Sequence, residues 1–369
     1  MATALAQRGW SVRVHERSRE LREIGAGIFL WENALQTLEA IGAYDEATGR
    51  GERDRYWEFR DERMRLLQSG WMMDGARLFT VLRTDLHRAL VNAARRSGVE
   101  IVTDSRVAGA TPDPALLLET GERLEADLVV GADGVGSRVR DALQLAISVT
   151  DLQDGCGRHL IERGPGDPVQ RTLEYWNGPR RVGVVPVTPE QVYVYLCCPS
   201  RDLDGRAKPL DRASWIRSFP HLSDIIERIP ETGVWASFSD VECHAWTAGS
   251  AAILGDAAHA MSPNLGQGAC VAMANGLALA AALEGRADVP AALKAWEARE
   301  RPVVAATQRF SRLYGRIGTR WPRPLLDARS ALVWAVGRSP ALQRKINVAA
   351  HHLPEARQDG AATADRVAA

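Results

Sequence analysis

Residues 251–259 read Ala-Ala-Ile-Leu-Gly-Asp-Ala-Ala-His, and this stretch decides the fold. Its apolar start predicts a short buried strand, and Gly255-Asp256 predicts a turn at the carboxyl end of that strand. Ligands bind at this end of the strands in open α/β sheets. A carboxylate placed there can accept hydrogen bonds from ligand hydroxyls. We therefore predict that Asp256 binds a ligand; the alternative is an ordinary tight turn in which Asp256 is solvated.

A glycine-rich turn follows, reading Pro-Asn-Leu-Gly-Gln-Gly-Ala over residues 263–269, and it opens an alanine-rich helix. A helix N-terminus carries about half a positive charge and unpaired N–H groups. It therefore suits a pyrophosphate or the electron-rich edge of a reduced flavin. We expect Pro263 to wall the flavin ring and keep water out. The predicted cofactor contacts in this turn are Pro263, Gly266, Gln267, Gly268 and Ala269.

A second motif, over residues 127–140, reads Asp-Leu-Val-Val-Gly-Ala-Asp-Gly-Val-Gly-Ser-Arg-Val-Arg. A short apolar strand runs into a turn that glycines tolerate easily, and Ser137 and Arg140 begin the next helix. Asp133 lies in the turn and is a further predicted cofactor contact. The two motifs together are stronger evidence for a dinucleotide or flavin site than either is alone.

Gly-Ala-Asp-Gly-x-x-Ser-x-x-Arg from residue 131, followed by Gly-Asp-Ala-Ala-His-x-x-x-Pro from residue 255, resembles the single-component FAD-dependent aromatic hydroxylases. These are the group A flavoprotein monooxygenases, with a p-hydroxybenzoate hydroxylase-like fold. The resemblance covers the chain to about residue 320. Residues 9–18, 25–31 and 268–275 resemble the subgroup of the 2-methyl-3-hydroxypyridine-5-carboxylate oxygenases.

The resemblance implies an α/β fold. We expect a Rossmann-like three-layer FAD-binding domain without its first strand, an inserted, mainly antiparallel substrate domain, and C-terminal helices. The expected FAD-binding domain comprises 1–55, 81–150 and 245–290. The other expected segments are a substrate sheet at 56–80 and 151–244, C-terminal helices at 291–353, and a disordered tail at 354–369.

The sequence contains no Gly-x-Gly-x-x-Gly turn, which relatives use to approach the FAD pyrophosphate. Residues 2–8 instead predict the helix that follows such a turn. Glu16 stands where an acidic residue binds the adenosine ribose, and it is a predicted cofactor contact with Arg17. Arg83 matches an arginine that contacts flavin in the family; the alternative is a solvated or salt-bridged arginine.

Two explanations for the missing turn compete: a start codon assigned too far downstream, and a true truncation that has lost flavin affinity. Lysine occurs only at Lys208, Lys294 and Lys345 among 46 basic residues, which indicates a GC-rich genome and favours the first explanation. Without its central strand a parallel sheet has unpaired edges, at a cost comparable with a domain's net stability. We therefore expect the chain as it stands either to express poorly or to bind FAD weakly.

By resemblance, reduced flavin reacts with O2 to give a C4a-hydroperoxide, which hydroxylates a small phenolic or N-heteroaromatic acid, with or without ring opening. The reductant is NADH or NADPH. Pro263, Tyr193 and Arg180 are predicted catalytic residues, and Tyr195 and Arg181 complete the predicted substrate site. An arginine fork matches a carboxylate. Tyr193 and Tyr195 share a strand face, so either can be the contact; core packing or surface charge is the alternative for each residue.

Two rival functions stay open. A flavoenzyme of another reaction type, such as a halogenase, lacks support because no W-x-W-x-I-P element is present. A non-catalytic remnant that keeps the fold is supported only by the missing glycine turn. His259 is a candidate general base, but in this motif we expect it to be a structural histidine.

Composition sets the remaining bounds. The chain has 369 residues, 25% of them charged, and a net charge of zero, so neither nucleic acid nor an anionic membrane is an expected partner. No signal peptide or membrane span is evident, so we expect a cytoplasmic protein. Five cysteines without metal-binding spacing predict reduced thiols and no metal. The expected partners are a small aromatic substrate and O2, and the expected state is a monomer or homodimer.

Overall fold

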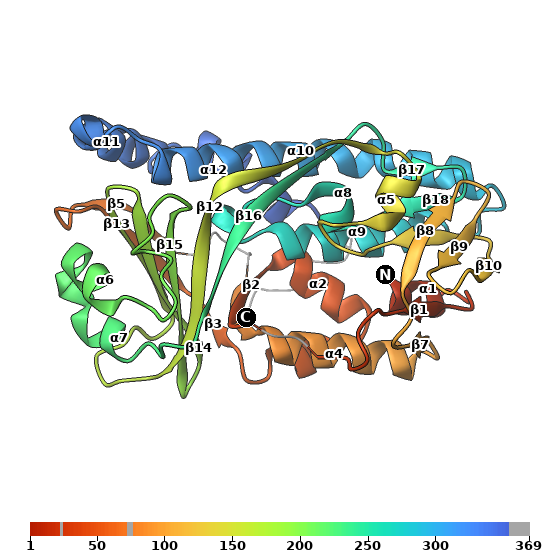
Figure 1. Ribbon diagram of the computed structural model, residues 1–369, viewed down its shortest axis with the longest axis horizontal. Coiled ribbons are helices and arrows are strands. Elements are labelled where there is room, and N and C mark those ends of the chain that lie inside the picture. Colours follow the sequence, from red (N-terminus) through yellow and green to blue (C-terminus); the bar gives the residue numbers. More distant parts are fainter. Residues whose placement is uncertain (23–24, 72–76, 354–369) are drawn as a thin grey trace, which may run out of the picture.

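The computed structural model describes residues 1–22, 25–71 and 77–353; the predicted disordered tail at 354–369 lies outside them. A large sheet and a mixed α/β part lie side by side, and a long helix runs along both (Figure 1). We call these the substrate part and the FAD part. The expected α/β class, with an inserted, mainly antiparallel sheet, is confirmed.

The substrate part is built on seven strands, and all neighbouring pairs are antiparallel except the parallel pair β13 and β4. In spatial order the strands are β16 (Val234–Cys243), β12 (Ala146–Glu162), β15 (Gln191–Pro199), β14 (Arg180–Thr188), β13 (Arg171–Asn177), β4 (Tyr56–Arg60) and β5 (Leu66–Trp71). The short helices α6 (Arg212–Ser218), η1 (Pro220–Leu222) and α7 (Ser223–Glu227) lie in this part.

Both faces of β14 and β15 are buried, and alternate side chains meet different neighbours. Val182 and Val194 join the cluster around Trp215 of α6. Val185 and Tyr193 point to the opposite face, where they meet residues of the FAD part. A strand with a period of two explains this division. The face that carries Tyr193 is therefore the one that meets the FAD part.

The FAD part contains two parallel strand pairs that are separate sheets within the described residues, in agreement with the expected absence of a central strand. These pairs are β1 (Arg13–His15) with β7 (Glu100–Val102), and β11 (Val129–Gly131) with β18 (Ala251–Ile253), which also pairs with β17 (Thr247–Ala248). Two further sheets hold β2 (Gly27–Trp31), β6 (Leu78–Leu82) and β3 (Glu52–Arg53), and β8 (Val107–Thr111), β9 (Ala115–Leu118) and β10 (Arg123–Glu125).

Helices cover these strands and enclose the largest apolar core, to which Leu35, Leu38 and Trp296 belong. In the FAD part they are α1 (Ala2–Ala6), α2 (Glu32–Ala40), α3 (Tyr44–Thr48), α4 (Arg83–Arg96), α5 (Arg138–Ala142), α8 (Asp256–His259), η2 (Pro263–Leu265) and α9 (Gly268–Ala282). The C-terminal layer comprises α10 (Val289–Thr319), η3 (Arg323–Leu325), α11 (Leu326–Gly337), α12 (Pro340–Ile346) and η4 (Val348–His351).

The two parts meet where β2 crosses under Tyr193. A Cβ atom on Gly27 would lie 2.8 Å from the Tyr193 ring, which is closer than carbon atoms approach in packed proteins. Glycine at this position therefore lets the FAD part contact the sheet directly.

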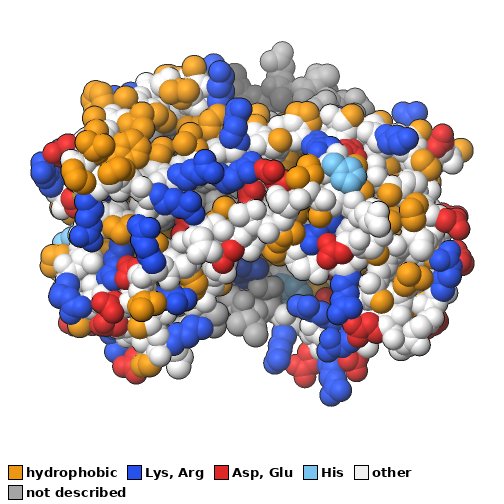
Figure 2. All heavy atoms as spheres, turned by 45° about the horizontal axis from the view of Figure 1, so that its top comes forward, with side chains coloured by type: hydrophobic (Ala, Val, Ile, Leu, Met, Phe, Trp, Pro, Cys, Tyr) orange, Lys and Arg blue, Asp and Glu red, His pale blue; other side chains and the backbone are white. Residues whose placement is uncertain are grey.

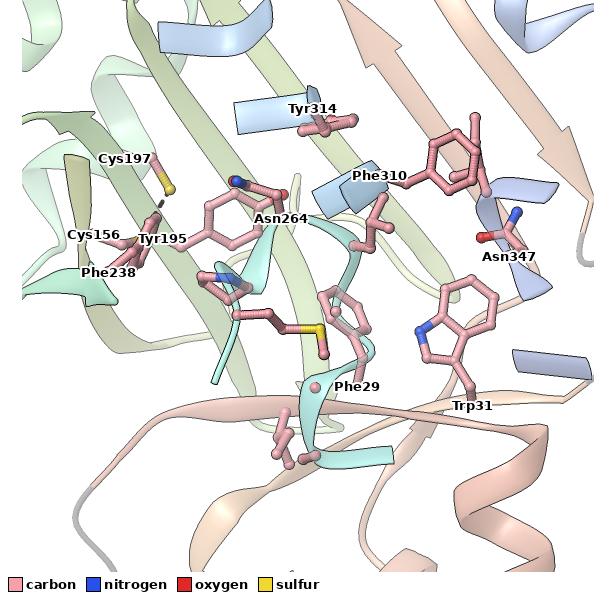
Figure 3. Close-up of a pocket in the computed structure, with 18 of the residues that line it drawn as sticks. Phe29, Trp31, Cys156, Tyr195, Cys197, Phe238, Asn264, Phe310, Tyr314 and Asn347 are labelled. Atoms are coloured by element: carbon pink, nitrogen blue, oxygen red, sulfur yellow. Dashed lines mark hydrogen bonds between the residues drawn. The ribbon is translucent and has the colours of Figure 1, made fainter. Parts of the chain in front are cut away.

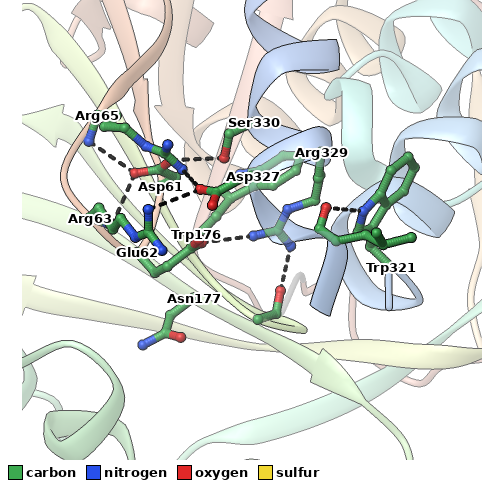
Figure 4. A network of polar contacts seen from close by, with 12 residues as sticks. Asp61, Glu62, Arg63, Arg65, Trp176, Asn177, Trp321, Asp327, Arg329 and Ser330 are labelled. Carbon is green, nitrogen blue, oxygen red and sulfur yellow. Dashed lines mark hydrogen bonds and ion pairs between the residues drawn. The ribbon is translucent and has the colours of Figure 1, made fainter. Parts of the chain in front are cut away.

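Helix α11 is anchored to the substrate part by polar side chains on the face that it turns toward the protein (Figure 4). Arg329 is fully buried, and it donates to the Gly178 carbonyl at 2.6 Å and to Glu62 at 3.0 Å. The Ser330 hydroxyl donates to Asp61 at 2.8 Å. The side of α11 that faces the protein is therefore partly polar.

Replacing Arg329 with alanine should lower the free energy of unfolding by about 3 kcal/mol, because removing one partner of a buried ion pair leaves Glu62 without its counter-charge. Urea unfolding of the two proteins measures this difference. Arg323→Ala, which changes an exposed arginine just before α11, is the matched control and should be nearly neutral. Equal effects of the two substitutions would contradict the anchoring role.

Candidate active site

A cavity of about 1120 Å³ lies between the FAD part, the substrate sheet and the C-terminal helices (Figure 3). Single small-molecule pockets usually enclose about 300–1,000 Å³. The cavity therefore has room for a cofactor ring beside a substrate. Of the predicted site residues, those that line it are Arg83, Arg181, Tyr193, Tyr195, Asp256, Pro263, Gly266, Gly268 and Ala269.

The turn after β18 presents Asp256 to this cavity. Gly255 has φ +63°, a backbone conformation that residues other than glycine rarely adopt. The turn brings Asp256 to the start of α8, where its carboxylate stays accessible. The surrounding protein raises the pKa of Asp256, and the positive charge of Arg83 opposes that rise. An accessible carboxylate between these elements can accept hydrogen bonds from ligand hydroxyls.

The N-terminus of α9 faces the same space through Gly268 and Ala269. No side chain caps this helix, so its first N–H groups are available to a ligand. Gln267 is buried and does not line the cavity; its amide nitrogen donates to Asn347 at 3.1 Å. The Gln267 side-chain oxygen Oε1 is buried and has no hydrogen-bond partner in the described part of the chain.

These observations fit a flavin. A carboxylate at a strand end, free amides at a helix N-terminus and an apolar wall match its ribityl hydroxyls, its pyrimidine edge and its ring system. Phe29 and Trp31 of β2 form part of that wall, and Gly266, with φ +62°, lies against the Phe29 ring (Figure 3).

The two sequence motifs are joined by Arg140, which is buried. Its Nη1 atom donates to the carbonyl of Val135, in the motif at 127–140, at 2.8 Å and to that of Ala257, in the motif at 251–259, at 3.2 Å. Asp133 caps α5 by accepting from the backbone N–H of Arg138 at 2.8 Å, and it does not line the cavity. Asp133 therefore stabilises the turn and the start of α5, and the structure does not present it to the cavity.

The predicted residues at the front of the chain lie apart from the cavity. Glu16 follows β1, and its carboxylate accepts from the Ser18 backbone N–H at 2.8 Å; Arg17 is exposed. Neither lines the cavity. Both stay predictions for the adenosine end of the cofactor.

The substrate end of the cavity holds a buried carboxylate, Glu174. It accepts hydrogen bonds from the Trp176 indole at 2.5 Å, from the Tyr314 hydroxyl at 2.7 Å and from the Tyr195 hydroxyl. Burial and the charge of Glu174 raise the pKa of both tyrosines well above the ordinary value, so both remain neutral donors. The Arg181 guanidinium lies 3.9 Å away.

Arg181 connects this cluster to the turn of the FAD part. It is buried, and its Nη2 atom donates to the Asn264 side-chain oxygen at 2.5 Å. Arg180 points to the other side of the sheet, where it forms an ion pair with Asp202 at 2.6 Å and stacks on Trp215. Adjacent strand residues face opposite sides, so the structure brings Arg181 to the cavity and places Arg180 away from it, contrary to its predicted catalytic role.

Arg158 is a cavity residue that sequence reasoning missed. It hydrogen-bonds to Tyr193 and lies 5.9 Å from the centre of the Phe238 ring. No carboxylate lies within ion-pair distance of it among the described residues. The nearby thiols of Cys156 and Cys197, 3.2 Å apart, also line the cavity. Glu174 and Arg158 were detectable as charges within apolar strands.

Aliphatic side chains of the C-terminal helices also line the cavity. No prediction assigned these residues to the site, because nothing local in the sequence brings α10, α11 and α12 together. They are Leu313, Ile317, Leu332, Val336, Leu342 and Ile346.

His259 is buried against Trp246 and does not line the cavity, as expected of a structural histidine. No cluster of side chains suited to a metal ion occurs in the part of the chain that the structure describes. Within those same residues, no helix has the length and apolar character needed to cross a membrane.

Comparisons with known proteins agree with this site. A family model for an FAD binding domain matches residues 1–311. The chain is 40% identical to a probable 2-heptyl-3-hydroxy-4(1H)-quinolone synthase of Rhodococcus erythropolis, with 88% of each chain covered. It is 37% identical to a 2-heptyl-3-hydroxy-4(1H)-quinolone synthase of Mycobacteroides abscessus, covering 89% of this chain and 90% of that one.

A crystal structure of a 2-methyl-3-hydroxypyridine-5-carboxylic acid oxygenase mutant superposes with a TM-score of 0.85 at 34% identity, covering 96% of this chain and 94% of the other. The chain therefore belongs to the family of single-component FAD-dependent aromatic hydroxylases. It is an FAD-binding flavoprotein of the monooxygenase class, as the two motifs indicate.

Acid should destabilise the protein through His259 and His159. Burial lowers the pKa of each to about 4, from an ordinary value of 6.5. Below pH 6.5 these two histidines are protonated in the unfolded chain, whereas in the folded chain they stay neutral until the pH falls to about 4. The contribution of the neutral histidines to the free energy of unfolding is therefore fully present above pH 6.5. It is lost as the pH falls toward 4, by on the order of 3 kcal/mol per histidine.

Urea unfolding at several pH values measures this loss. His259→Phe should flatten the curve between pH 6.5 and 4. His244→Phe, at an exposed histidine, should leave it unchanged. An unaltered curve in His259→Phe would show that this histidine is protonated in the folded protein.

Replacing Asp256 with asparagine should weaken FAD binding about tenfold or more, since hydrogen bonds to a charged group contribute about 1.5–3 kcal/mol. Flavin fluorescence titration measures the dissociation constant. The matched control, Asp204→Asn, changes an exposed carboxylate in the substrate part and should have no effect. Unchanged affinity in Asp256→Asn would remove Asp256 from the cofactor site.

Proposed function

We propose that the protein is an FAD-dependent monooxygenase that uses NAD(P)H and O2 to hydroxylate an N-heteroaromatic ring carrying an alkyl chain, of the 2-alkyl-4-quinolone class. The observation that carries this proposal is that the cavity lining combines the polar cluster around Glu174, called the polar end, with six aliphatic side chains of the C-terminal helices, called the aliphatic end. Two relatives, at 40% and 37% identity, bear the name of a heptyl-hydroxyquinolone synthase.

The polar end suits a neutral ring. Arg181 and Glu174 lie close together, and Glu174 accepts from three further donors, so their charges are largely satisfied within the protein. An additional carboxylate beside Glu174 would be repelled. The Tyr193 hydroxyl and Asn264 remain close enough to the cavity to orient a ring N–H or carbonyl group.

The aliphatic end suits an alkyl substituent. Six branched side chains of the C-terminal helices line it, from Leu313 to Ile346. Burying each methylene of a ligand contributes about 0.8 kcal/mol. A small ring without such a chain would leave this surface facing water.

FAD, when bound and reduced, supplies the oxygen-transfer chemistry. The protein's own residues position and shield the reacting ring. Pro263 and Leu265 wall the ring side of the site and exclude water, and Asn264 links that wall to Arg181. The hydroxyls of Tyr195 and Tyr314, held neutral by burial, donate to Glu174, so this carboxylate does not need hydrogen bonds from the substrate.

A second candidate substrate is a small phenolic or N-heteroaromatic acid, which the sequence predicts. Arg158 favours it, because this arginine lines the cavity and no ion pair to it occurs in the described residues. A guanidinium can hold a carboxylate through two parallel hydrogen bonds. The oxygenase with the similar structure is named for such an acid.

The reductant, NADH or NADPH, stays a prediction, as do a cytoplasmic location and a monomeric or homodimeric state. The small aromatic substrate and O2 are the partners that the proposed reaction requires.

The test compares 2-heptyl-4-quinolone with a hydroxypyridine carboxylate in FAD-supplemented assays of NAD(P)H oxidation, with mass spectrometry of the product. We expect the quinolone to stimulate oxidation and to gain one oxygen atom. Ile317→Gln should raise KM for the heptyl compound about tenfold and change it little for a methyl analogue. Arg158→Gln should leave quinolone turnover in place.

Turnover of the carboxylate alone, abolished by Arg158→Gln, would replace the quinolone proposal with the acid. Flavin binding without stimulated oxidation by either compound would contradict both.

A further inference from the structure

The outer surface of the C-terminal helices is unusually apolar. Among the described residues, eleven large apolar side chains are markedly exposed, and seven of them belong to this layer or to the adjoining β4–β5 turn. These seven are Met64, Leu66, Leu313, Leu325, Leu332, Trp334 and Leu342. Contiguous exposed apolar surface on a protein usually marks an interaction site.

Helix α11 explains why this surface faces outward. Its inner side is held by Arg329 and Ser330, which bond to the substrate part (Figure 4). Leu332 and Trp334, two positions apart, lie on the two flanks of that inner side, and Trp334 is 47% exposed. These exposed apolar side chains are not covered by the contacts that anchor the helix.

Positive charge surrounds the apolar residues. Residues 313–346 contain six exposed arginines and lysines, besides the buried Arg329, and one acidic residue, Asp327, although the whole chain has a net charge of zero. Arg63 and Arg65 of the neighbouring turn form ion pairs with Asp327 at 3.2 and 2.6 Å. The Arg338 guanidinium lies 3.9 Å from the centre of the Trp334 ring. Figure 2 shows hydrophobic side chains gathered at one end of this face with basic side chains beside them.

The surface is continuous with the cavity. Leu332 and Leu342 are exposed and also line the aliphatic end of the cavity. Leu325 and Trp334 are exposed but do not line it, so they belong to the outer surface alone. The same helices therefore form both the mouth of the cavity and the apolar surface around it.

We infer that this surface, formed by the β4–β5 turn, η3, α11 and α12, docks on an anionic lipid bilayer. Aromatic and aliphatic side chains surrounded by arginine and lysine are the combination that binds the interface of anionic membranes, where each basic residue contributes about 1 kcal/mol. A symmetric dimer through this face would bring together two copies of the basic patch that contains Arg338, Arg344 and Lys345, and the repulsion between them disfavours such a dimer. The whole-chain charge predicts no membrane partner; the local distribution points to one.

Docking would set the cavity mouth against the bilayer. An apolar molecule dissolved in the lipid could then enter between the C-terminal helices without crossing water. This consequence rests on the proposed function, whereas lipid binding does not, so the test below uses no substrate.

The experiment is flotation of the full chain with vesicles of phosphatidylcholine alone or mixed equally with phosphatidylglycerol. We expect binding to the anionic vesicles, at least tenfold weaker binding to phosphatidylcholine, and a decline as salt is raised. Trp334→Glu should reduce binding to anionic vesicles at least tenfold. Leu203→Glu, at a leucine of the substrate part that is even more exposed than Trp334, should leave it unchanged.

A second variant, Arg344→Glu with Lys345→Glu, keeps the apolar residues and should also reduce binding. All of these positions are exposed, and thermal unfolding checks that the variants fold. Absence of binding to either vesicle, or equal losses in Trp334→Glu and Leu203→Glu, would overturn the proposal. So would an oligomer in sedimentation velocity that Trp334→Glu dissociates without any lipid binding by the wild type, because the surface would then join copies of the chain.

Discussion

The buried guanidinium of Arg140 is the contact on which the cofactor half of the site depends. It donates to carbonyls in the turns of both sequence motifs, at Val135 and Ala257, and so fixes two segments that are far apart in the chain. A buried charge is tolerated only when its donors are satisfied. Each turn therefore requires the other, and Asp256 reaches the cavity because both are in place.

A second constraint joins the cofactor half to the substrate half. Gly27 of β2 lies directly under the Tyr193 ring, and Asn264 of the glycine-rich turn accepts from Arg181 of the sheet. These contacts set the width of the cavity between the two parts. The buried cluster around Glu174 then satisfies its charge within the protein, which leaves a polar end suited to a neutral ring and an aliphatic end suited to a chain.

The local sequence pattern was sufficient to predict the strands, turns and helices of the two glycine-containing motifs. The glycines and apolar runs around Asp256 and Asp133 predict strand, turn and helix, and the structure has them there. Alternation predicts that Tyr193 and Tyr195 share a face, and both line the cavity. The same alternation also separates Arg180 from Arg181, but the sequence did not indicate which of the two faces the cavity. That outcome depends on what covers each side of the sheet.

By itself the sequence determined the family, the positions of the turns that face a flavin and the class of chemistry, because these depend on short motifs whose geometry is local. Only the tertiary structure decided that Arg158 and Glu174 meet the cavity, that α10 to α12 form its aliphatic end, and that basic and apolar side chains gather on one outer surface. Those features depend on which distant faces pack together. Zero net charge could not reveal the last of them, because a sum over the chain carries no information about where the charges lie.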